Sequence, residues 1–239
     1  MEVLRVTQLS KTYPGFRLED VSFSVRKGTV MGFIGRNGAG KTTTLKAIMN
    51  MVHADAGQVE FFGLDMARNE DTIKQRIGYA GGAVDYYKKR SIEKLLAVTK
   101  TFYIHWDDAV CSHYLRLFSL DIRKTPSELS EGMKVKLNLA IALSHGAELL
   151  ILDEPTSGLD PVSRAELLEI FRHLKSRGVS ILFSTHITSD LDQCADDITY
   201  IQNGHIVYTG SLAGFTGDET LESVMVRQEM EALHEKFTV

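Results

Sequence analysis

The chain has 239 residues, 44% of them apolar and 24% charged, which is ordinary for a globular protein and enough for a sizeable buried core. A formal charge of −4 excludes the strongly basic surface of a dedicated nucleic-acid binder, and Cys111 and Cys194 alone exclude a disulfide framework. We expect a reducing, cytosolic compartment, with neither a signal peptide nor a membrane-spanning run of about 18 apolar residues.

The first sixty residues alternate between strand and helix signals. Short runs rich in valine and phenylalanine predict strands at 2–9 and 21–25, and a buried strand over 30–35 ends on glycine. Apolar residues at helical spacing then predict a helix over 42–52, and glycines bound another strand over 56–63.

A phosphate-binding loop lies between the buried strand and the first helix. The segment GRNGAGKT (35–42) fits G-x-x-x-x-G-K-[ST], in which glycines let backbone N–H groups surround phosphates at a helix N-terminus. In this chemistry Lys41 meets the β and γ oxygens, and the hydroxyl of Thr42 completes a Mg²⁺ shell. The residues expected to hold the nucleotide here are Gly35, Arg36, Asn37, Gly38, Ala39, Gly40, Lys41, Thr42 and Thr43.

The middle of the chain changes character. Three successive helices are predicted over 91–103, 108–120 and 130–146, with no strand between them. We therefore expect a helical subdomain over 83–146, inserted into an α/β core within a single domain, 1–239.

From Glu148 the alternation of strand and helix returns. A buried strand over 149–152 ends in two carboxylates; Asp153 is placed to hold Mg²⁺, and Glu154 to accept a proton from an attacking water. Alternatively, the two carboxylates form a solvated strand terminus or a helix cap. The nearby phosphate loop favours the magnesium and proton-acceptor roles.

The remaining elements complete an α/β pattern. Asp160 and a proline begin a helix that Gly178 stops, and a strand follows over 180–184. A hairpin over 198–210 turns at Asn203-Gly204, and a helix over 219–237 closes the chain. This order predicts a mostly parallel sheet with ligands at the carboxyl ends of its strands.

The segment LSEGMK (129–134) has the features of a second anion site, because Ser130 can cap a helix and Gly132 lets a ligand approach the backbone. Together with the loop and the acidic strand end, it resembles the ATP-binding cassette (ABC) family, whose signature is LSGGQ. SGLD (157–160) is similar to that family's D-loop, STH (184–186) to its switch histidine, and Tyr13 to its adenine-stacking aromatic. The resemblance covers nearly the whole chain.

The resemblance implies a fold and a site. The fold is a P-loop NTPase core with a mostly parallel sheet, an N-terminal antiparallel β subdomain and the inserted helical subdomain. Two cassettes pack head to tail around Mg-ATP, so that Ser130 and Gly132 of one reach the nucleotide on Lys41 of the other. In such a site Glu154 is the base, His186 orients the water, and Asp160 lies near the nucleotide.

The resemblance also implies partners: a second cassette, a separate transmembrane permease that places the chain on the inner face of the membrane, and no nucleic acid. The chain departs from the family pattern at three positions, and in these departures it resembles cassettes of small bacterial exporters. Glu131 and Met133 replace a glycine and the glutamine of the signature, and Gly82 stands where the family has a glutamine that touches Mg²⁺. Asp85 is a possible substitute for it.

These departures leave an alternative open, in which the chain is a non-hydrolysing or weakly active regulatory cassette paired with an active one. A cassette ATPase working on DNA or ribosomes and a nucleotide kinase are further alternatives. The first usually carries coiled coils or two cassettes in one chain, and the second lacks LSEG and STH. The residues after the strand, Tyr86 to Arg90, are expected to face the permease or to form a solvated loop.

Overall fold

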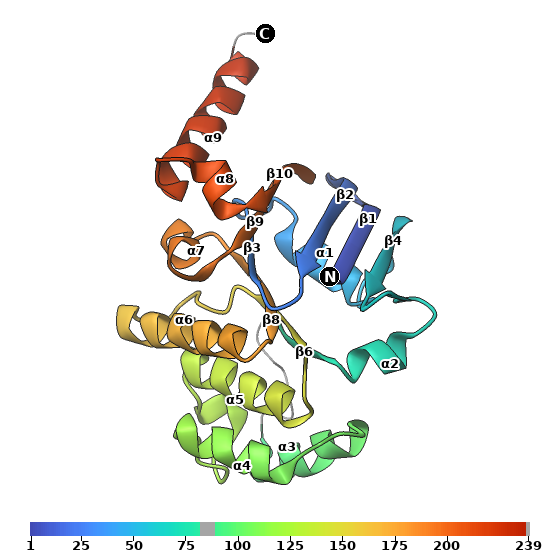
Figure 1. Cartoon of the computed structure of the whole chain (residues 1–239), viewed down its shortest axis with the longest axis vertical. Coiled ribbons are helices and arrows are strands. Elements are labelled where there is room, and N and C mark those ends of the chain that lie inside the picture. Colours follow the sequence, from blue (N-terminus) through green and yellow to red (C-terminus); the bar gives the residue numbers. More distant parts are fainter. Residues whose placement is uncertain (82–88, 238–239) are drawn as a thin grey trace.

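The computed structural model describes residues 1–81 and 89–237, and the side chains of residues 1–81 and 89–230. Figure 1 shows α3, α4 and α5 gathered at one end of the molecule, while α9 leaves the other end and carries the C-terminus. The strands are β1 (Glu2–Tyr13), β2 (Phe16–Arg26), β3 (Val30–Ile34), β4 (Ala56–Phe61), β5 (Leu64–Asp65), β6 (Ile77–Gly81), β7 (Leu149–Asp153), β8 (Ser180–Thr185), β9 (Asp197–Gln202) and β10 (His205–Ser211). The α-helices are α1 (Lys41–Ile48), α2 (Glu70–Lys74), α3 (Ile92–Thr99), α4 (Asp108–Leu117), α5 (Glu131–Ser144), α6 (Pro161–Ser176), α7 (Thr188–Cys194), α8 (Leu212–Thr216) and α9 (Leu221–Phe237).

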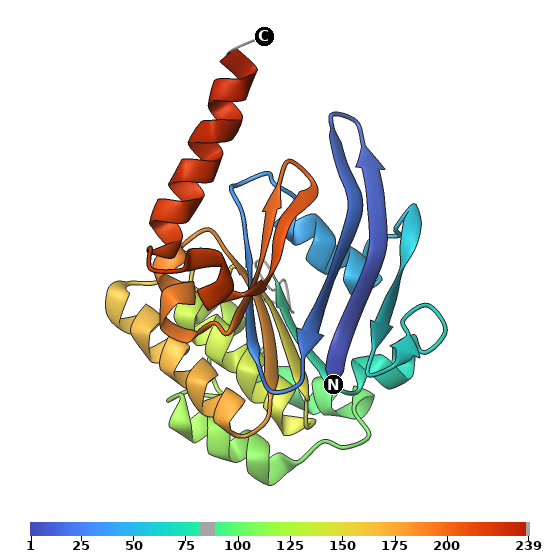
Figure 2. The same cartoon turned by 45° about the horizontal axis from the view of Figure 1, so that its top comes forward.

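The central sheet has the order β10-β9-β3-β8-β7-β6 and is parallel except for β10, which pairs antiparallel with β9. A second, antiparallel sheet has the order β2-β1-β4-β5. Figure 2 shows this second sheet to one side of the central one. The predicted combination of a mostly parallel core, an antiparallel N-terminal sheet and a helical segment is confirmed.

Alternation along the central strands divides the core into two parts. On β7, Leu149 and Ile151 join α1 and the antiparallel sheet in one apolar cluster. Leu150 and Leu152 join the helices on the opposite face in the other cluster. A strand covered on both faces is continuously apolar, which explains why LLIL reads as one apolar run in the sequence.

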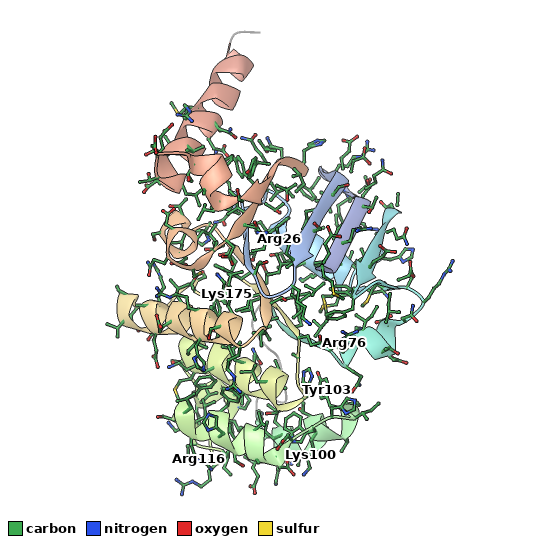
Figure 3. The ribbon with its side chains drawn as sticks, viewed as in Figure 1. Arg26, Arg76, Lys100, Tyr103, Arg116 and Lys175 are labelled. Atoms are coloured by element: carbon green, nitrogen blue, oxygen red, sulfur yellow. The ribbon has the colours of Figure 1, made fainter. Side chains whose placement is uncertain are left out.

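An ion pair joins the two sheets. The guanidinium of Arg26 on β2 donates to both carboxylate oxygens of Asp197 on β9, at 2.9 and 2.8 Å. Arg26 is labelled in Figure 3. The bidentate geometry fixes the orientation of β2 against the central sheet, because both donors of the planar fork are used at once.

The predicted helix over 42–52 is wrong at its C-terminal end. The helix ends at Ile48, and Asn50 has a φ of 55°, in the left-handed region. The amides of Met51 and Asn50 then donate to the carbonyls of Lys46 and Ala47, at 2.9 and 3.0 Å. This is the Schellman arrangement that terminates helices, so Val52 lies outside the helix although it keeps the apolar spacing.

The middle of the chain is helical, as predicted. Ser91 caps α3 through the amide of Lys94, and Asp107 caps α4 through the amides of Ala109 and Val110. Short elements that periodicity did not indicate are β5, α2, α7 and α8, each of seven residues or fewer. Elements this short cannot establish a repeat.

Both cysteines are buried and free. Burial raises the pKa of the Cys111 thiol, and raises that of Cys194 to about 12. Within residues 1–81 and 89–237, no helix combines the length and the apolar character that crossing a membrane requires.

Candidate functional site

The phosphate loop connects β3 to α1 at the carboxyl end of the central sheet. Gly38 and Gly40 have φ of 81° and 115°, in the left-handed region that glycine adopts without strain. Gly40 is the residue before the first helical residue, Lys41, and makes no side-chain cap. The backbone N–H groups at this terminus are therefore available to an anion, as a phosphate loop requires.

A turn from a distant part of the chain supports this loop from behind. The amide of Gly204, between β9 and β10, donates to the carbonyl of Ala39 at 2.9 Å, and the Gly204 carbonyl accepts from the amide of Glu19 at 2.9 Å. A Cβ on Gly204 would lie 1.9 Å from the carbonyl oxygen of Arg17, so only glycine fits. The hairpin turn thus joins the phosphate loop to β2.

Three charged or titratable side chains form a line across the site. The Lys41 Nζ lies 3.1 Å from Oε1 of Glu154, whose Oε2 lies 2.7 Å from Nδ1 of His186. Lys41 also donates to the carbonyls of Gly35 and Arg36, at 2.7 and 3.3 Å. A buried ammonium, a carboxylate and an imidazole in this order can hold an anion and accept a proton beside it.

The end of β7 is held by the neighbouring strand β8. The hydroxyl of Ser184 donates to Oδ1 of Asp153 at 2.6 Å and accepts from the amide of Glu154 at 2.9 Å. Glu154 has a φ of 52°, which is unusual for a residue with a side chain. Burial and the charge of Asp153 raise the pKa of Tyr79, on β6, to about 12, so that its hydroxyl stays protonated beside that carboxylate.

A cavity of about 690 Å³ opens over the loop and the line of side chains. Its volume lies within the range of small-molecule sites. The residues that line it are Gly15, Phe16, Asn37, Gly38, Gly40, Lys41, Thr42, Thr43, Glu154, Ser157 and His186.

Three of the predicted loop residues do not line the cavity, and their contacts are with other residues of the chain. Gly35 accepts a hydrogen bond from Lys41, and Ala39 accepts one from Gly204. Arg36 has a side chain that is 77% exposed and lies 3.6 Å from Glu229 on α9. Glu229 also accepts a hydrogen bond of 2.7 Å from the hydroxyl of Tyr200.

A second cavity, of about 230 Å³, shares Glu154 and Ser157 with the first and is also lined by Asp153 and Glu131. Asp153 lies in this neighbouring cavity, one residue from Glu154. The carboxylate of Glu131 is 60% exposed and pairs with Lys134 at 2.6 Å. The unusual glutamate of LSEGMK is thus paired within its own helix.

Ser130 and Gly132 lie at the start of α5 and do not line the 690 Å³ cavity. Ser130 is the N-cap, and its hydroxyl accepts from the amide of Met133 at 3.3 Å. A Cβ on Gly132 would lie 3.3 Å from Leu159, in the loop before α6. Within one chain, the structure does not bring these two residues to Lys41's cavity.

Asp160 caps α6, accepting from the amides of Val162 and Ser163 at 3.0 and 3.1 Å and from the Ser163 hydroxyl at 2.6 Å. These bonds, led by that of the hydroxyl, lower the pKa of Asp160. Its carboxylate is exposed but already engaged in capping. The predicted N-cap is confirmed.

Sequence reasoning missed Phe16. Tyr13 is 38% exposed, lies 5.6 Å from Nζ of Lys11, and is not among the residues that line the cavity. Phe16, three residues later, lines it, and a Cβ on Gly40 would lie 3.0 Å from its ring. A second aromatic residue in the same turn was the available signal.

The position of the expected glutamine, Gly82, lies outside the described residues, as do Asp85, Tyr86, Tyr87 and Lys88. β6 ends at Gly81, which pairs with Asp153. Beyond that segment, a cavity of about 400 Å³ is lined by Arg90, Lys94, Leu95, Ala97 and Val98.

Comparisons with known proteins agree with the geometry. A family model described as ABC transporter matches residues 18–157. The chain is 36% identical to the bacitracin transport ATP-binding protein BcrA of Bacillus licheniformis over 210 residues, covering 86% of this chain and 68% of that protein. It is 34% identical to the lantibiotic transport ATP-binding protein SrtF of Streptococcus pyogenes, covering 95% and 97%. A solved structure of an ATP-binding subunit of an ABC transporter superposes with a TM-score of 0.84 at 30% identity, covering 94% and 98%.

Proposed function

Because the chain belongs to the ABC transporter family of ATP-binding cassettes, and is therefore an ATPase, we propose that it hydrolyses Mg-ATP to drive a separate membrane permease. The observation that carries this proposal is the line Lys41, Glu154 and His186 along one cavity. A regulatory cassette without hydrolysis has no need of a carboxylate and an imidazole in hydrogen-bond contact at the phosphate end of its site.

In the proposed site the phosphates lie against the backbone of residues 35–43, and Lys41 exchanges its present contact with Glu154 for the β and γ oxygens. The adenine lies toward the turn that carries Tyr13 and Phe16. Of these two rings, Phe16 lines the cavity, so both are candidates for stacking.

The residues also fit a magnesium ion. Mg²⁺ keeps several waters and takes only one or two protein oxygens beside those of the phosphates. The exposed hydroxyl of Thr42 and the carboxylate of Asp153 supply that number of oxygens. When bound, the ion neutralises charge that develops on the phosphate oxygens.

We assign the chemical step to Glu154 and His186. Glu154 accepts the proton of the attacking water, and His186 holds the carboxylate and the γ-phosphate in register. Removal of the phosphate contact frees Lys41 to return to Glu154. The strained backbone at Glu154 fits a residue whose side chain must face the ligand.

A second cassette completes the site. Ser130, Gly132 and Asp160 lie at the starts of α5 and α6, away from the cavity of their own chain. We propose that they meet the nucleotide held by a partner's loop, so that Mg-ATP joins two subunits. Glu131 does not oppose this, since its charge is paired with Lys134.

We further propose that 83–146 is an inserted helical subdomain of the single domain 1–239, and that it meets the permease. Two observations support a contact with the permease on this side of α3: the cavity that Arg90 helps to line, and the half-exposed apolar side chain of Val98. The names of both curated relatives refer to transport. Such a contact holds the chain on the cytoplasmic face of the membrane.

The test is the turnover of Mg-ATP by the purified chain and by Glu154→Gln. Loss of a general base costs roughly 10²–10⁴-fold in rate. Glu154→Gln is expected to lose turnover on this scale while it still binds ATP, whereas Lys41→Ala is expected to lose ATP binding. Unchanged turnover in Glu154→Gln would remove Glu154 from the role assigned to it.

A further inference from the structure

A buried polar cluster lies next to the site and has no part in the function described so far. It consists of Asp190 on α7, Thr156 in the loop between β7 and α6, and Arg164 in the first turn of α6. Asp190 and Thr156 are both 0% exposed. The cluster therefore joins three elements, two of which begin next to Glu154 or His186.

Four atoms of the cluster are buried and make no hydrogen bond of ordinary length and angle among the described residues. They are both carboxylate oxygens of Asp190, the hydroxyl of Thr156 and Nε of Arg164. The nearest approach is 3.9 Å, between Nε of Arg164 and Oδ1 of Asp190. Buried polar atoms are nearly always bonded, so four unpaired ones at one place need a physical explanation.

The explanation lies in how little movement would pair them. A hydrogen bond between nitrogen and oxygen is about 2.9 Å long, so an approach of about 1 Å would close the contact between Arg164 and Asp190. Burial raises the pKa of Asp190, hydrogen bonding by the Thr156 hydroxyl and the charges of Arg164 and His186 lower it, and the charge of Glu154 raises it. All four groups thus lie near enough to interact with the carboxylate.

The cluster is connected to both proposed catalytic side chains. Thr156 lies two residues after Glu154, in the loop that ends at Asp160. Asp190 lies four residues after His186, on the helix that this histidine precedes. A closer contact between Asp190 and either neighbour would draw the loop of Glu154 and the helix that follows His186 toward one another.

We propose that Asp190 is a positioning residue for ATP hydrolysis, which closes on Thr156 and Arg164 to hold His186 in its contact with Glu154. The proposal rests on the roles assigned above to these two side chains. It adds to them a group that does not line the nucleotide cavity. Because the arrangement described here leaves these buried atoms poorly paired, the cluster would stabilise the contact between His186 and Glu154 further when the loop and α7 approach each other.

The chain offers a matched control at the other end of the same two helices. Lys175, at the end of α6, pairs with Asp196, which follows α7, at 2.6 Å. The other oxygen of Asp196 accepts from the amide of Val30 at 2.9 Å. Lys175 is labelled in Figure 3. This pair also links α6 to the segment after α7, but neither residue lines the two cavities beside Glu154.

The test compares Asp190→Asn and Thr156→Val with Asp196→Asn, by kcat, KM and Tm. Both substitutions in the cluster keep the shape of the side chain. Displacement of a reacting group by about 1 Å can cost as much as 10²-fold in rate. We expect Asp190→Asn and Thr156→Val to lower kcat by at least about five-fold with KM kept and Tm not lowered, and Asp196→Asn to lower Tm and keep kcat.

A fall in kcat of less than about five-fold in both cluster variants would overturn the proposal. It would also be overturned if the ratio of the loss of kcat to the loss of Tm were the same in the cluster variants as in Asp196→Asn. The single variant Arg164→Gln and the double variant Arg164→Gln/Asp190→Asn add a second criterion. If the residues act as one unit, the double variant loses no more kcat than the worse single variant. Multiplicative losses would mean that they act separately.

A second readout keeps this inference distinct from the proposed function. The ¹⁵N chemical shifts of the His186 ring report which nitrogen carries the proton. We expect Asp190→Asn to change them and Asp196→Asn to leave them. If the wild-type chain does not hydrolyse Mg-ATP, the proposed function fails and these shifts alone decide the inference; unchanged shifts in Asp190→Asn then overturn it.

Discussion

At the scale of single residues, Ser184 contacts both acidic residues at the end of β7. Its hydroxyl fixes the Asp153 carboxylate and the Glu154 amide, and its carbonyl accepts from the same amide at 3.2 Å. A left-handed φ at a residue such as Glu154 costs about 1–3 kcal/mol and persists only where its surroundings hold it. Ser184 is the neighbour that does so.

We predict that Ser184→Ala lowers the turnover of Mg-ATP, because Asp153 and the Glu154 backbone lose their common partner. The free energy of unfolding should fall by about 0.5–1.5 kcal/mol, because the Asp153 carboxylate loses a hydrogen bond while the Glu154 amide keeps the Ser184 carbonyl as an acceptor. Ser180→Ala is the control: this hydroxyl is also buried on β8 and accepts from the amide of Gly28 at 2.8 Å. It should lower stability similarly and leave turnover unchanged. Equal turnover in both variants would contradict the prediction.

The buried carboxyl of Asp190 predicts a dependence of stability on pH. Burial raises its pKa above the ordinary 3.8, so the folded chain keeps a proton that the unfolded chain has released. The stability contributed by this proton is complete below pH 3.8 and is lost as pH rises through the folded pKa. The amide of Asp190→Asn cannot titrate, so the Tm of this variant minus that of the wild type should increase as pH rises above 4. A Tm difference that stays constant with pH would contradict this.

At the scale of elements, the β9–β10 turn supports the phosphate loop. We predict that Gly204→Ala weakens ATP binding and lowers Tm, because the new Cβ would lie 1.9 Å from the Arg17 carbonyl and push the turn away from Ala39. Gly178→Ala is the control, with a φ of 86° against 85° but no atom within 4 Å of the added Cβ. It should cost only the backbone strain, about 1–2 kcal/mol, and keep ATP affinity. Equal affinities in the two variants would contradict the prediction.

Most elements could be predicted from the sequence where pattern and punctuation agree. Asp160 with Pro161 marked the start of α6, and Asn203-Gly204 marked the hairpin. The end of α1 could not be predicted, because Val52 keeps the apolar spacing while the left-handed Asn50 ends the helix. α7 has seven residues, too few for a periodic signal.

The site divides in the same way. Local motifs predicted Lys41, Asp153 and Glu154, because each is a short pattern with its own chemistry. The contact between Glu154 and His186 joins residues 32 positions apart and follows from the pairing of β7 with β8. Asp190 has no local pattern. STH marks Ser184 and the hairpin signal marks Gly204, but only the fold brings Ser184 to Asp153 and Gly204 to Ala39.

At the scale of the whole molecule, Ser130 and Gly132 lie away from their own chain's nucleotide cavity. We predict that Glu154→Gln, which binds ATP without hydrolysing it, is a monomer alone and a dimer with Mg-ATP, as measured by light scattering after size-exclusion chromatography. Glu154→Gln/Lys41→Ala is the control and should stay monomeric with Mg-ATP. Monomers of Glu154→Gln under both conditions would contradict pairing between two copies of this chain.

The two buried thiols have a practical consequence for labelling. A thiol must be accessible and ionised to react, and Cys194, with a pKa of about 12, is neither at neutral pH; burial protects Cys111 in the same way. A cysteine introduced at Val98, which is 48% exposed on α3, would then be the one reactive thiol of the folded chain. A fluorophore at that position would report directly on whatever docks against the helical segment, without removal of either native cysteine.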